Sequence, residues 1–357
     1  MKRMLFLTST LMCVGFAAAA QGELNIVSWG GAYGASQMEA YHKPYMALTG
    51  IKINSIDADN PATPIKAQVE AGNVSIDIAD VEPSDLVRLC DEGALEVLPI
   101  DELPDGADGT PAADDFIEGG LYDCGVGTIV YSTLIAYRTD TGVAPTSSAD
   151  FFDLEKFPGK RGLRKGAKYS LELALMADGV PPAEVYDVLG TPEGVDRAFA
   201  KLDTIKDQVI WWEAGAQPPQ LLADGEVVMT TAYNGRIFNA MMEENQPFAL
   251  LWPNQIYDFN LWVIPKGAPH KDAAWEFIKW STDTQRLADQ AGFISYGPAR
   301  KSSSPLVGLF KDGKTEMGPH MPTNPDYVAD ALTTDIEFWA DHDIELNERF
   351  NAWLAAS

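Results

Sequence analysis

The chain has 357 residues, a hydrophobic fraction of 46% and a formal net charge of −26 at pH 7. Its length favours two domains over one, and its composition is that of a globular protein. The acidic excess would repel a phosphate polymer, which excludes nucleic acid as a partner. A field of this sign attracts cationic solutes, and it serves equally well as a solubility device.

The N-terminus has the layout of a cleavable secretory signal. Lys2 and Arg3 precede an apolar run at residues 5–16, and four alanines follow before the polar Gln21. This layout predicts a signal peptide at residues 1–20 and a periplasmic location. The apolar run is too short to span a bilayer, so we expect a soluble mature protein. Loss of Lys2 and Arg3 changes the net charge from −26 to −28.

Two cysteines remain after cleavage, Cys90 and Cys124. Exported proteins meet an oxidising compartment, and an even pair permits one disulfide. We therefore predict a Cys90–Cys124 disulfide. Two buried free thiols are the alternative.

Strand-like and helix-like segments alternate through the first part of the mature chain. The expected strands are residues 24–29, 51–56, 77–81 and 128–138. The expected helices are residues 36–48, 63–71 and 83–92, each stopped at or next to a glycine. Residues 128–138 form the longest β-rich run, and are about long enough to leave one domain and enter another.

The same alternation continues to residue 290. Here the expected strands are residues 209–212, 227–232 and 260–265. The expected helices are residues 185–189, 194–205, 219–223, 237–244, 272–282 and 284–290. Such alternation favours an α/β fold with a mostly parallel sheet covered on both faces.

Two α/β lobes joined by crossing strands would place a cleft at the sheet ends, where open α/β folds bind ligands. We expect lobe 1 at residues 21–136 plus 262–305. Lobe 2 is expected at residues 137–261 plus 306–357. Closure of the two lobes over a solute would be a hinge motion.

No catalytic motif is recognisable. The four histidines have no spacing that would bind a metal from one helix face, and neither a nucleophile elbow nor a phosphate-binding glycine loop occurs. With 52 acidic residues, some carboxylate pair always looks catalytic, so such pairs are uninformative. We expect a binding protein without catalytic residues, metal or cofactor. A periplasmic enzyme is the remote alternative.

Aromatic, acidic and amide side chains gather at the expected strand ends. Aromatic walls suit a methylene chain or an ammonium group, and a cation over a ring contributes about 0.5–2 kcal/mol. Filling of the core between the lobes is the alternative role for such rings. A carboxylate in a closing cleft holds an ammonium by a charge-assisted hydrogen bond. The candidate ligand-binding residues are Trp29, Tyr33, Glu82, Asp85, Tyr131, Glu213, Tyr233, Asp258 and Asn260.

A basic cluster lies at residues 160–168. Its side chains Arg164, Lys165 and Lys168 either belong to a solvated loop or form an anion clamp, for which arginine offers a bidentate grip.

Taken together, these features resemble the periplasmic polyamine-binding proteins of ATP-driven importers. Their wider solute-binding superfamily also serves opines, aminoethylphosphonate, iron and thiamine. The resemblance covers nearly all of the mature chain. Its landmarks, weak singly but strong in this order, are Trp29 and residues 49–53, 77–81, 92–93, 157–162, 225–227, 233–235, 264–268 and 275–278. It implies a two-lobed type II fold with the ligand cleft between the lobes, a monomer, and a membrane permease as partner.

The resemblance also assigns positions in the pocket. Trp29 matches the first-loop aromatic of the family, residues 81–85 match its second pocket loop, and Tyr233 matches a pocket tryptophan. Asn260 stands at the amine-binding aspartate of the family.

Several positions depart from the polyamine binders. Asp258 replaces a tryptophan, Gly30 and Gly31 replace a polar and an acidic residue, and the basic cluster replaces an acidic pair. We favour a polyamine such as putrescine or spermidine as the ligand. The alternative is a zwitterionic amine, such as an amino acid derivative, an opine or an aminophosphonate, held partly by Arg164, Lys165 and Lys168.

Overall fold

The computed structural model describes residues 22–142 and 144–356, so the predicted signal peptide lies outside the described residues. The strands are β1 (Glu23–Ser28), β2 (Lys52–Asp57), β3 (Ile78–Val81), β4 (Leu121–Tyr122), β5 (Gly125–Arg138), β6 (Arg161–Arg164), β7 (Val209–Trp212), β8 (Met229–Tyr233), β9 (Phe248–Val263), β10 (Gly297–Pro298) and β11 (Leu332–Thr333). Within the described residues they form one 11-stranded sheet with the order β2-β1-β3-β9-β5-β8-β6-β7. The short strands β4 and β10 pair with β5, and β11 pairs with β9.

The two ends of the sheet are parallel and its middle is antiparallel. At one end β1 lies between β2 and β3, and at the other β6 lies between β7 and β8. Between them β5 and β9 pair antiparallel with each other, β9 with β3, and β5 with β8. The prediction of a mostly parallel sheet therefore holds for the two ends, and the antiparallel pair joins them.

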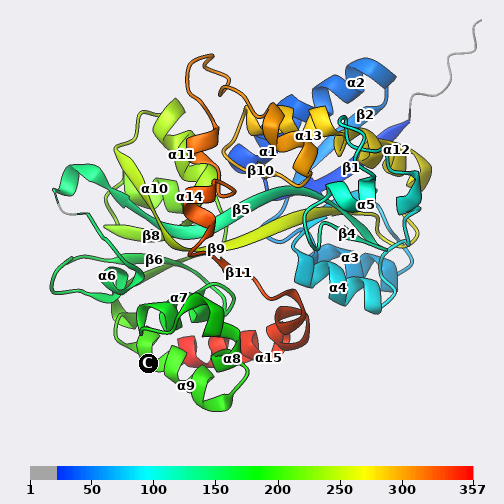
Figure 1. Cartoon of the computed structure of the whole chain (residues 1–357). Coiled ribbons are helices and arrows are strands. Elements are labelled where there is room, and N and C mark those ends of the chain that lie inside the picture. The colour runs from blue at the N-terminus through cyan, green and yellow to red at the C-terminus, as the bar shows by residue number, and fades with distance from the viewer. Residues whose placement is uncertain (1–21, 143, 357) are drawn as a thin grey trace, which may run out of the picture.

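The strands β5 and β9 cross the middle of the molecule side by side (Figure 1). The predicted strand at residues 260–265 was too short, because β9 already begins at Phe248. Pro253 and Asn254, which has a φ of 60°, interrupt the β-rich pattern in its first half. Pairing with β5 overrides that weak local preference.

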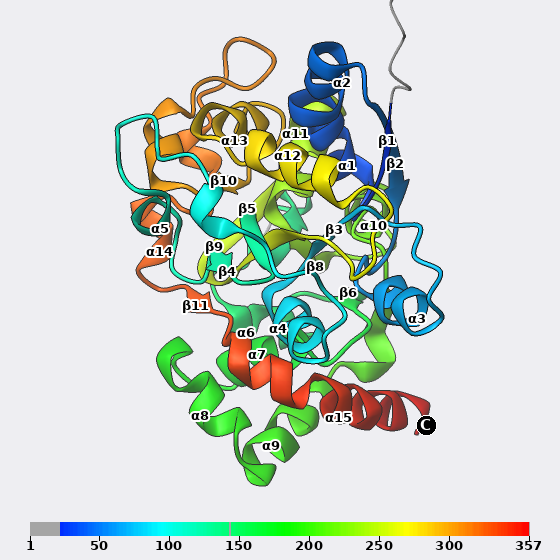
Figure 2. The ribbon, with the colours of Figure 1, turned by 90° about the vertical axis from the view of Figure 1, so that its right-hand side faces the viewer.

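Helices cover both faces of the sheet (Figures 1 and 2). They are α1 (Gly31–Gln37), α2 (Lys43–Thr49), α3 (Thr63–Glu70), α4 (Pro83–Asp91), α5 (Ala112–Asp115), α6 (Ser148–Phe152), α7 (Ser170–Ala177), α8 (Val185–Leu189), α9 (Pro192–Asp203), α10 (Gln217–Ala223), α11 (Asn234–Glu243), α12 (Lys271–Ser281), α13 (Thr284–Ala291), α14 (Pro325–Val328) and α15 (Ile336–Ala355). None of these described helices combines the length and apolar character needed to cross a membrane.

The molecule is the two-lobed α/β structure that the sequence predicts. One lobe, called lobe 1 below, is built on β1–β3, and its core includes Leu24, Ile78 and Phe277. The other, lobe 2, is built on β6–β8, and its core includes Leu163 and Phe199. Helix α15 contributes to the lobe 2 core and also contacts α4 of lobe 1 (Figure 2). The residue boundaries of the lobes stay a prediction.

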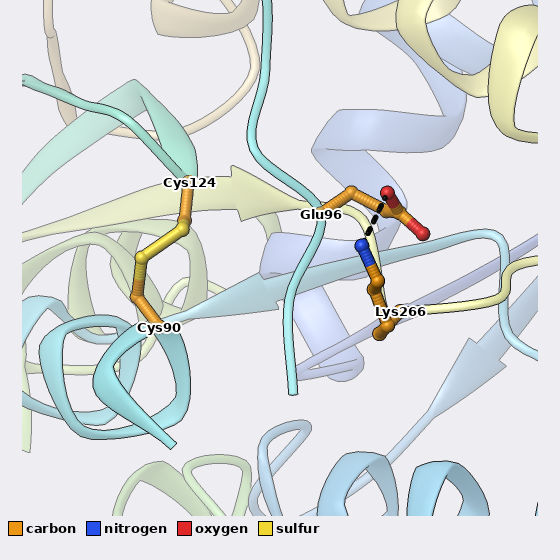
Figure 3. The surroundings of a disulfide bond; sticks show 4 residues. All are labelled: Cys90, Glu96, Cys124 and Lys266. Atoms are coloured by element: carbon orange, nitrogen blue, oxygen red, sulfur yellow. Dashed lines mark hydrogen bonds and ion pairs between the residues drawn. A yellow bond between two sulfur atoms is a disulfide. The ribbon is translucent and has the colours of Figure 1, made fainter. Parts of the chain in front are cut away.

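The predicted disulfide is present (Figure 3). It joins Cys90 of α4 to Cys124, directly before β5, with the two Cα atoms 6.0 Å apart. Close by, the ammonium of Lys266 pairs with the carboxylate of Glu96 at 3.3 Å. The disulfide thus fastens the helix that follows β3 to one of the two crossing strands.

Replacing both cysteines by alanine is expected to lower the free energy of unfolding by about 2–4 kcal/mol, because the cross-link restricts the unfolded chain. The two cysteines are 34 residues apart in sequence. Urea denaturation of the wild type and of the double variant, each with and without reductant, measures the effect. Equal stability of the oxidised wild type and the double variant would contradict the prediction.

Candidate ligand-binding site

A cavity of about 410 Å³, a volume that includes the open space at its mouth, lies between the two lobes, where several strands end. Its walls come from lobe 1, from lobe 2 and from the crossing strands. They are formed by Trp29, Tyr33, Asp59, Glu82, Ile129, Tyr131, Glu213, Gly215, Tyr233, Arg236, Asn260 and Tyr296. Trp29, Glu82 and Glu213 directly follow β1, β3 and β7, which places the cavity at the carboxyl ends of parallel strands.

Seven of the nine predicted ligand-binding residues line this cavity. They are Trp29, Tyr33, Glu82, Tyr131, Glu213, Tyr233 and Asn260. The other two do not. Asp85 faces a neighbouring polar cavity of about 670 Å³, and Asp258 is buried behind the wall with 1% of its surface exposed.

Aromatic rings make up much of the cavity wall. The ring of Tyr131 packs edge-on against that of Tyr233, with centroids 5.4 Å apart. Tyr233 makes a similar contact with Trp212 at 5.8 Å, and Tyr33 with Tyr296 at 5.4 Å. Such mutually packed rings are held in place by their neighbours, so they form a rigid apolar surface.

Glu82 is the centre of a buried charge network that connects the lobes. Its carboxylate pairs with Lys168 at 2.9 Å and with Arg164 at 3.4 Å, and it accepts a hydrogen bond from Tyr131 at 3.2 Å. Lys168 also pairs with Asp258 at 3.0 Å. Although burial alone raises the pKa of a carboxyl, Lys168 and Arg164 lower the pKa of Glu82 to about 2.

The predicted anion-clamp residues are thus already paired with carboxylates. Arg164 and Lys168 bind Glu82, and the exposed Lys165 binds Glu213 at 2.9 Å. All three lie on the neighbouring polar cavity rather than on the 410 Å³ cavity. Their positive charges are balanced by protein side chains.

The same pairing accounts for the acidic candidates. Glu82 and Asp258 share Lys168, Glu213 has Lys165, and Asp85 pairs with Arg88 at 2.5 Å. Each carboxylate that the sequence offered to an ammonium group therefore has a cation of the protein beside it. Sequence patterns could not show this, because Lys168 is 86 residues from Glu82 along the chain.

Sequence reasoning missed Arg236, which among the described residues is the one arginine in the cavity wall. It lies in the first turn of α11, three residues after Tyr233, and only 5% of its surface is exposed. Its Nη1 donates to the carbonyl oxygen of Gly30 and its Nη2 to that of Trp29, both at 3.0 Å. The sequence signal that could have found Arg236 was its position in the first turn of a helix that directly follows a strand ending at the cleft.

Four buried polar atoms of the cavity wall have no hydrogen-bond partner within residues 22–142 and 144–356. They are Trp29 Nε1, Tyr33 Oη, Arg236 Nε and Asn260 Oδ1. Buried polar groups of native proteins are nearly always hydrogen-bonded. The cavity wall therefore has two donors, one acceptor and one hydroxyl without a partner in the described residues.

The buried carboxylate of Asp80 lies behind the cavity wall and is hydrogen-bonded to its neighbours. Oδ2 of Asp80, on β3, accepts hydrogen bonds from Gln37 at 2.7 Å and Ser28 at 3.0 Å. Oδ1 of Asp80 has no partner in the described part of the chain. Burial raises the pKa of Asp80 to about 7, although hydrogen bonds from its neighbours lower it. Asp80 in turn raises the pKa of Tyr33, which burial has already raised.

The fold and the site define a receptor for a small solute, and comparison with known proteins agrees. Residues 40–323 match the family described as bacterial extracellular solute-binding protein, and the chain belongs to this family. It is a binding protein and not an enzyme, as the sequence predicts.

Three known proteins illustrate which members of the family this chain is similar to. The γ-aminobutyric acid (GABA)-binding protein of Pseudomonas aeruginosa is 45% identical over 350 residues, which cover 97% of this chain and 96% of that protein. The solved structure of the Atu4243-GABA receptor is 33% identical, with a TM-score of 0.79 over 94% of this chain and 98% of that one. The PBP MotA from A. tumefaciens B6, in complex with glucopine, is 32% identical, with a TM-score of 0.84 over 93% and 99%.

Proposed function

We propose that this protein is the periplasmic receptor of an ABC importer for a zwitterionic amino acid with its amine and carboxylate at opposite ends of a short chain, such as GABA. In this role it closes over the solute and delivers it to a membrane permease. The similarity to GABA-binding proteins supports this ligand class. It favours the zwitterionic alternative over the polyamine that the sequence analysis preferred.

The balance of charges around the cavity carries the proposal. Among the acidic residues of the wall, Glu82 and Glu213 are paired with lysines, and only the exposed Asp59 has no ion-pair partner among the described residues. Arg236 adds one positive charge. A diamine would bring two more positive charges into this balanced site, and an unpaired buried charge costs several kcal/mol. A zwitterion brings no net charge.

The shape and chemistry of the wall fit such a solute. The rings of Tyr131 and Tyr233 offer an apolar surface to a methylene chain and their faces to an ammonium group. The unpartnered Oδ1 of Asn260 accepts a hydrogen bond from the ammonium, which in this arrangement needs no carboxylate as sole partner.

A thermal-shift screen tests the proposed ligand class, because a ligand that binds only the folded state raises the melting temperature by mass action. GABA is expected to raise it, whereas putrescine and spermidine at equal concentration leave it unchanged. A polyamine shift without a GABA shift would contradict the proposal. An opine in the same screen tests whether larger zwitterions are also accepted.

The variants Trp29→Ala and Tyr233→Ala are each expected to weaken GABA binding by about 1–3 kcal/mol, because both rings line the cavity. Trp252→Ala is the control, since Trp252 stacks on Tyr327 at 4.3 Å and does not contribute to the cavity wall. Calorimetry measures the affinities, and melting temperatures without ligand separate loss of contact from loss of fold. Unchanged affinity in both cavity variants would show that these rings serve only the core.

A further inference from the structure

Asp80 has a buried carboxyl with no cation beside it among the residues that the structure describes. Its side chain is 0% exposed, and the hydrogen bonds from Ser28 and Gln37 reach only its Oδ2. Its Oδ1 has no hydrogen-bond partner in this part of the chain. A buried carboxylate without a counter-charge destabilises a fold. The presence of Asp80 therefore points to a role outside stability.

Strand register and helix spacing place Asp80 directly behind two residues of the cavity wall. Asp80 of β3 pairs with Trp262 of β9, and Asn260 lies two residues before Trp262, on the same face of the sheet. In α1, Gln37 donates to Asp80 at 2.7 Å, and Tyr33 lies four residues earlier on the same face of the helix. Asn260 and Tyr33 both line the cavity. The carboxyl is thus one side chain away from the cavity.

Both of these wall residues have a polar atom without a partner. Oδ1 of Asn260 and Oη of Tyr33 are buried and make no hydrogen bond within the described residues. An amide has donors on one side and an acceptor on the other. An ionised carboxylate only accepts hydrogen bonds, so it favours the orientation in which the amide donors face it and the amide oxygen points away. A protonated carboxyl also donates, and so it does not favour this orientation.

The other titratable groups around Asp80 are tyrosines. Burial raises the pKa of Tyr33 and of Tyr41, and Asp80 raises both further. Burial also raises the pKa of Tyr296, which Arg236 lowers and Asp80 raises. Burial raises the pKa of Asp80 itself to about 7. Among these groups, only Asp80 changes its charge near neutral pH.

We propose that Asp80 is a positioning residue for the amine of the solute: its ionised carboxylate turns the Asn260 amide so that Oδ1 faces the cavity, and a proton on Asp80 removes this preference. The inference rests on the proposed function, in which Oδ1 of Asn260 accepts a hydrogen bond from the ammonium. The negative charge behind the wall also attracts the ammonium, and the ammonium in turn favours loss of the proton from Asp80. Binding of the amine therefore releases protons near pH 7, and the affinity rises with pH up to about 7.

Calorimetry of GABA binding to the wild type, in buffers of different ionisation enthalpy, measures the protons released. At pH 7 up to about half a proton per GABA is expected, because Asp80 is then half protonated before binding. Between pH 5 and pH 8 the affinity for GABA should rise about tenfold, since a pKa lowered by about one unit on binding corresponds to this factor. The amine and the carboxyl of GABA keep their charges over this range.

Asp80→Asn keeps the shape of the side chain and removes its charge. At pH 8 this variant should bind GABA about tenfold more weakly than the wild type, with no proton release and no rise of affinity with pH. Its melting temperature without ligand should be no lower than that of the wild type, because the substitution removes a buried charge that has no counter-charge. Weaker binding by an equally stable protein separates positioning of the amine from damage to the fold.

Glu172→Gln is the matched control. Glu172 of α7 is also a buried carboxyl without an ion pair among the described residues, and burial raises its pKa to about 7. It accepts hydrogen bonds from Trp339 and Tyr186 and does not line the cavity. This variant should keep the proton release and the pH dependence of the wild type.

GABA binding without proton release and with a pH-independent affinity in the wild type would overturn the inference alone. The same holds for a proton release that persists in Asp80→Asn or disappears in Glu172→Gln, because the protons would then not come from Asp80. A wild type that binds putrescine and not GABA would overturn the proposed function and the inference with it.

Discussion

Replacing Lys168 with methionine is expected to lower the free energy of unfolding by about 3–5 kcal/mol at neutral pH, because it leaves buried carboxylates without their cation. Lys168 pairs with Glu82 at 2.9 Å and with Asp258 at 3.0 Å, and all three side chains are at least nine-tenths buried. After the substitution, Glu82 retains Arg164 as a partner, but Asp258 retains no cation among the described residues. The loss should be smaller at pH 5, where a buried carboxyl with a raised pKa takes up a proton.

The neighbouring lysine supplies a matched control. Lys165 also pairs with a glutamate at 2.9 Å, but 42% of its side chain and 61% of that of Glu213 are exposed. Lys165→Met is therefore expected to change stability by about 1 kcal/mol or less. Urea denaturation of both variants at pH 7.5 and pH 5 makes the comparison. Similar losses for the two lysines would show that the buried network does not stabilise the fold as described.

Replacing Asp80 with asparagine is expected to increase stability at pH 8 and to change it little at pH 4. The pKa of this carboxyl is about 7 in the folded protein, against an ordinary value of 3.8. Below 3.8 the group is protonated in both states, so its charge costs nothing. As the pH rises from 3.8 to about 7, the Asp80 carboxyl loses its proton in the unfolded state but largely keeps it in the folded state. The free energy of unfolding therefore decreases progressively over this range. Above pH 7 the full cost, at most about 4 kcal/mol, is present.

The measurement is a series of urea denaturations between pH 4 and pH 8 for the wild type and Asp80→Asn. The difference between the two curves isolates Asp80, because other groups contribute equally to both. Asp330→Asn, at an exposed carboxylate, controls for the loss of one negative charge. A difference that stays constant across this pH range would contradict a raised pKa at Asp80.

Local sequence patterns predicted most elements of the fold. The helix at residues 185–189 and the strand at residues 209–212 occur as expected, because apolar periodicity and glycine or proline stops act within a few residues. Helix α7 was not predicted, since all eight of its residues are buried and no polar face marks a helical period. The first half of β9 was not predicted either, because its pairing with β5 is a long-range contact.

The candidate site shows the same division. Residues at strand ends, such as Trp29 and Glu82, could be found because the carboxyl ends of parallel strands meet at one edge. The sequence could not show which charged side chains lack an ion-pair partner, because Lys168 contacts Glu82 only in the folded chain. Arg236 shows the converse, since an ordinary helix arginine becomes part of the cavity wall once the lobes meet at the Trp29 turn.

Isothermal titration calorimetry with GABA and putrescine tests the central claim most directly. The two solutes share four carbons and one amine, and differ in whether the other end is a carboxylate or a second amine. The balanced charges of the cavity predict one GABA bound per chain, with a dissociation constant at least about 100-fold lower than that of putrescine, a difference of about 2.7 kcal/mol. Putrescine that binds as tightly as GABA, or more tightly, would show that the site takes polyamines and would contradict the account.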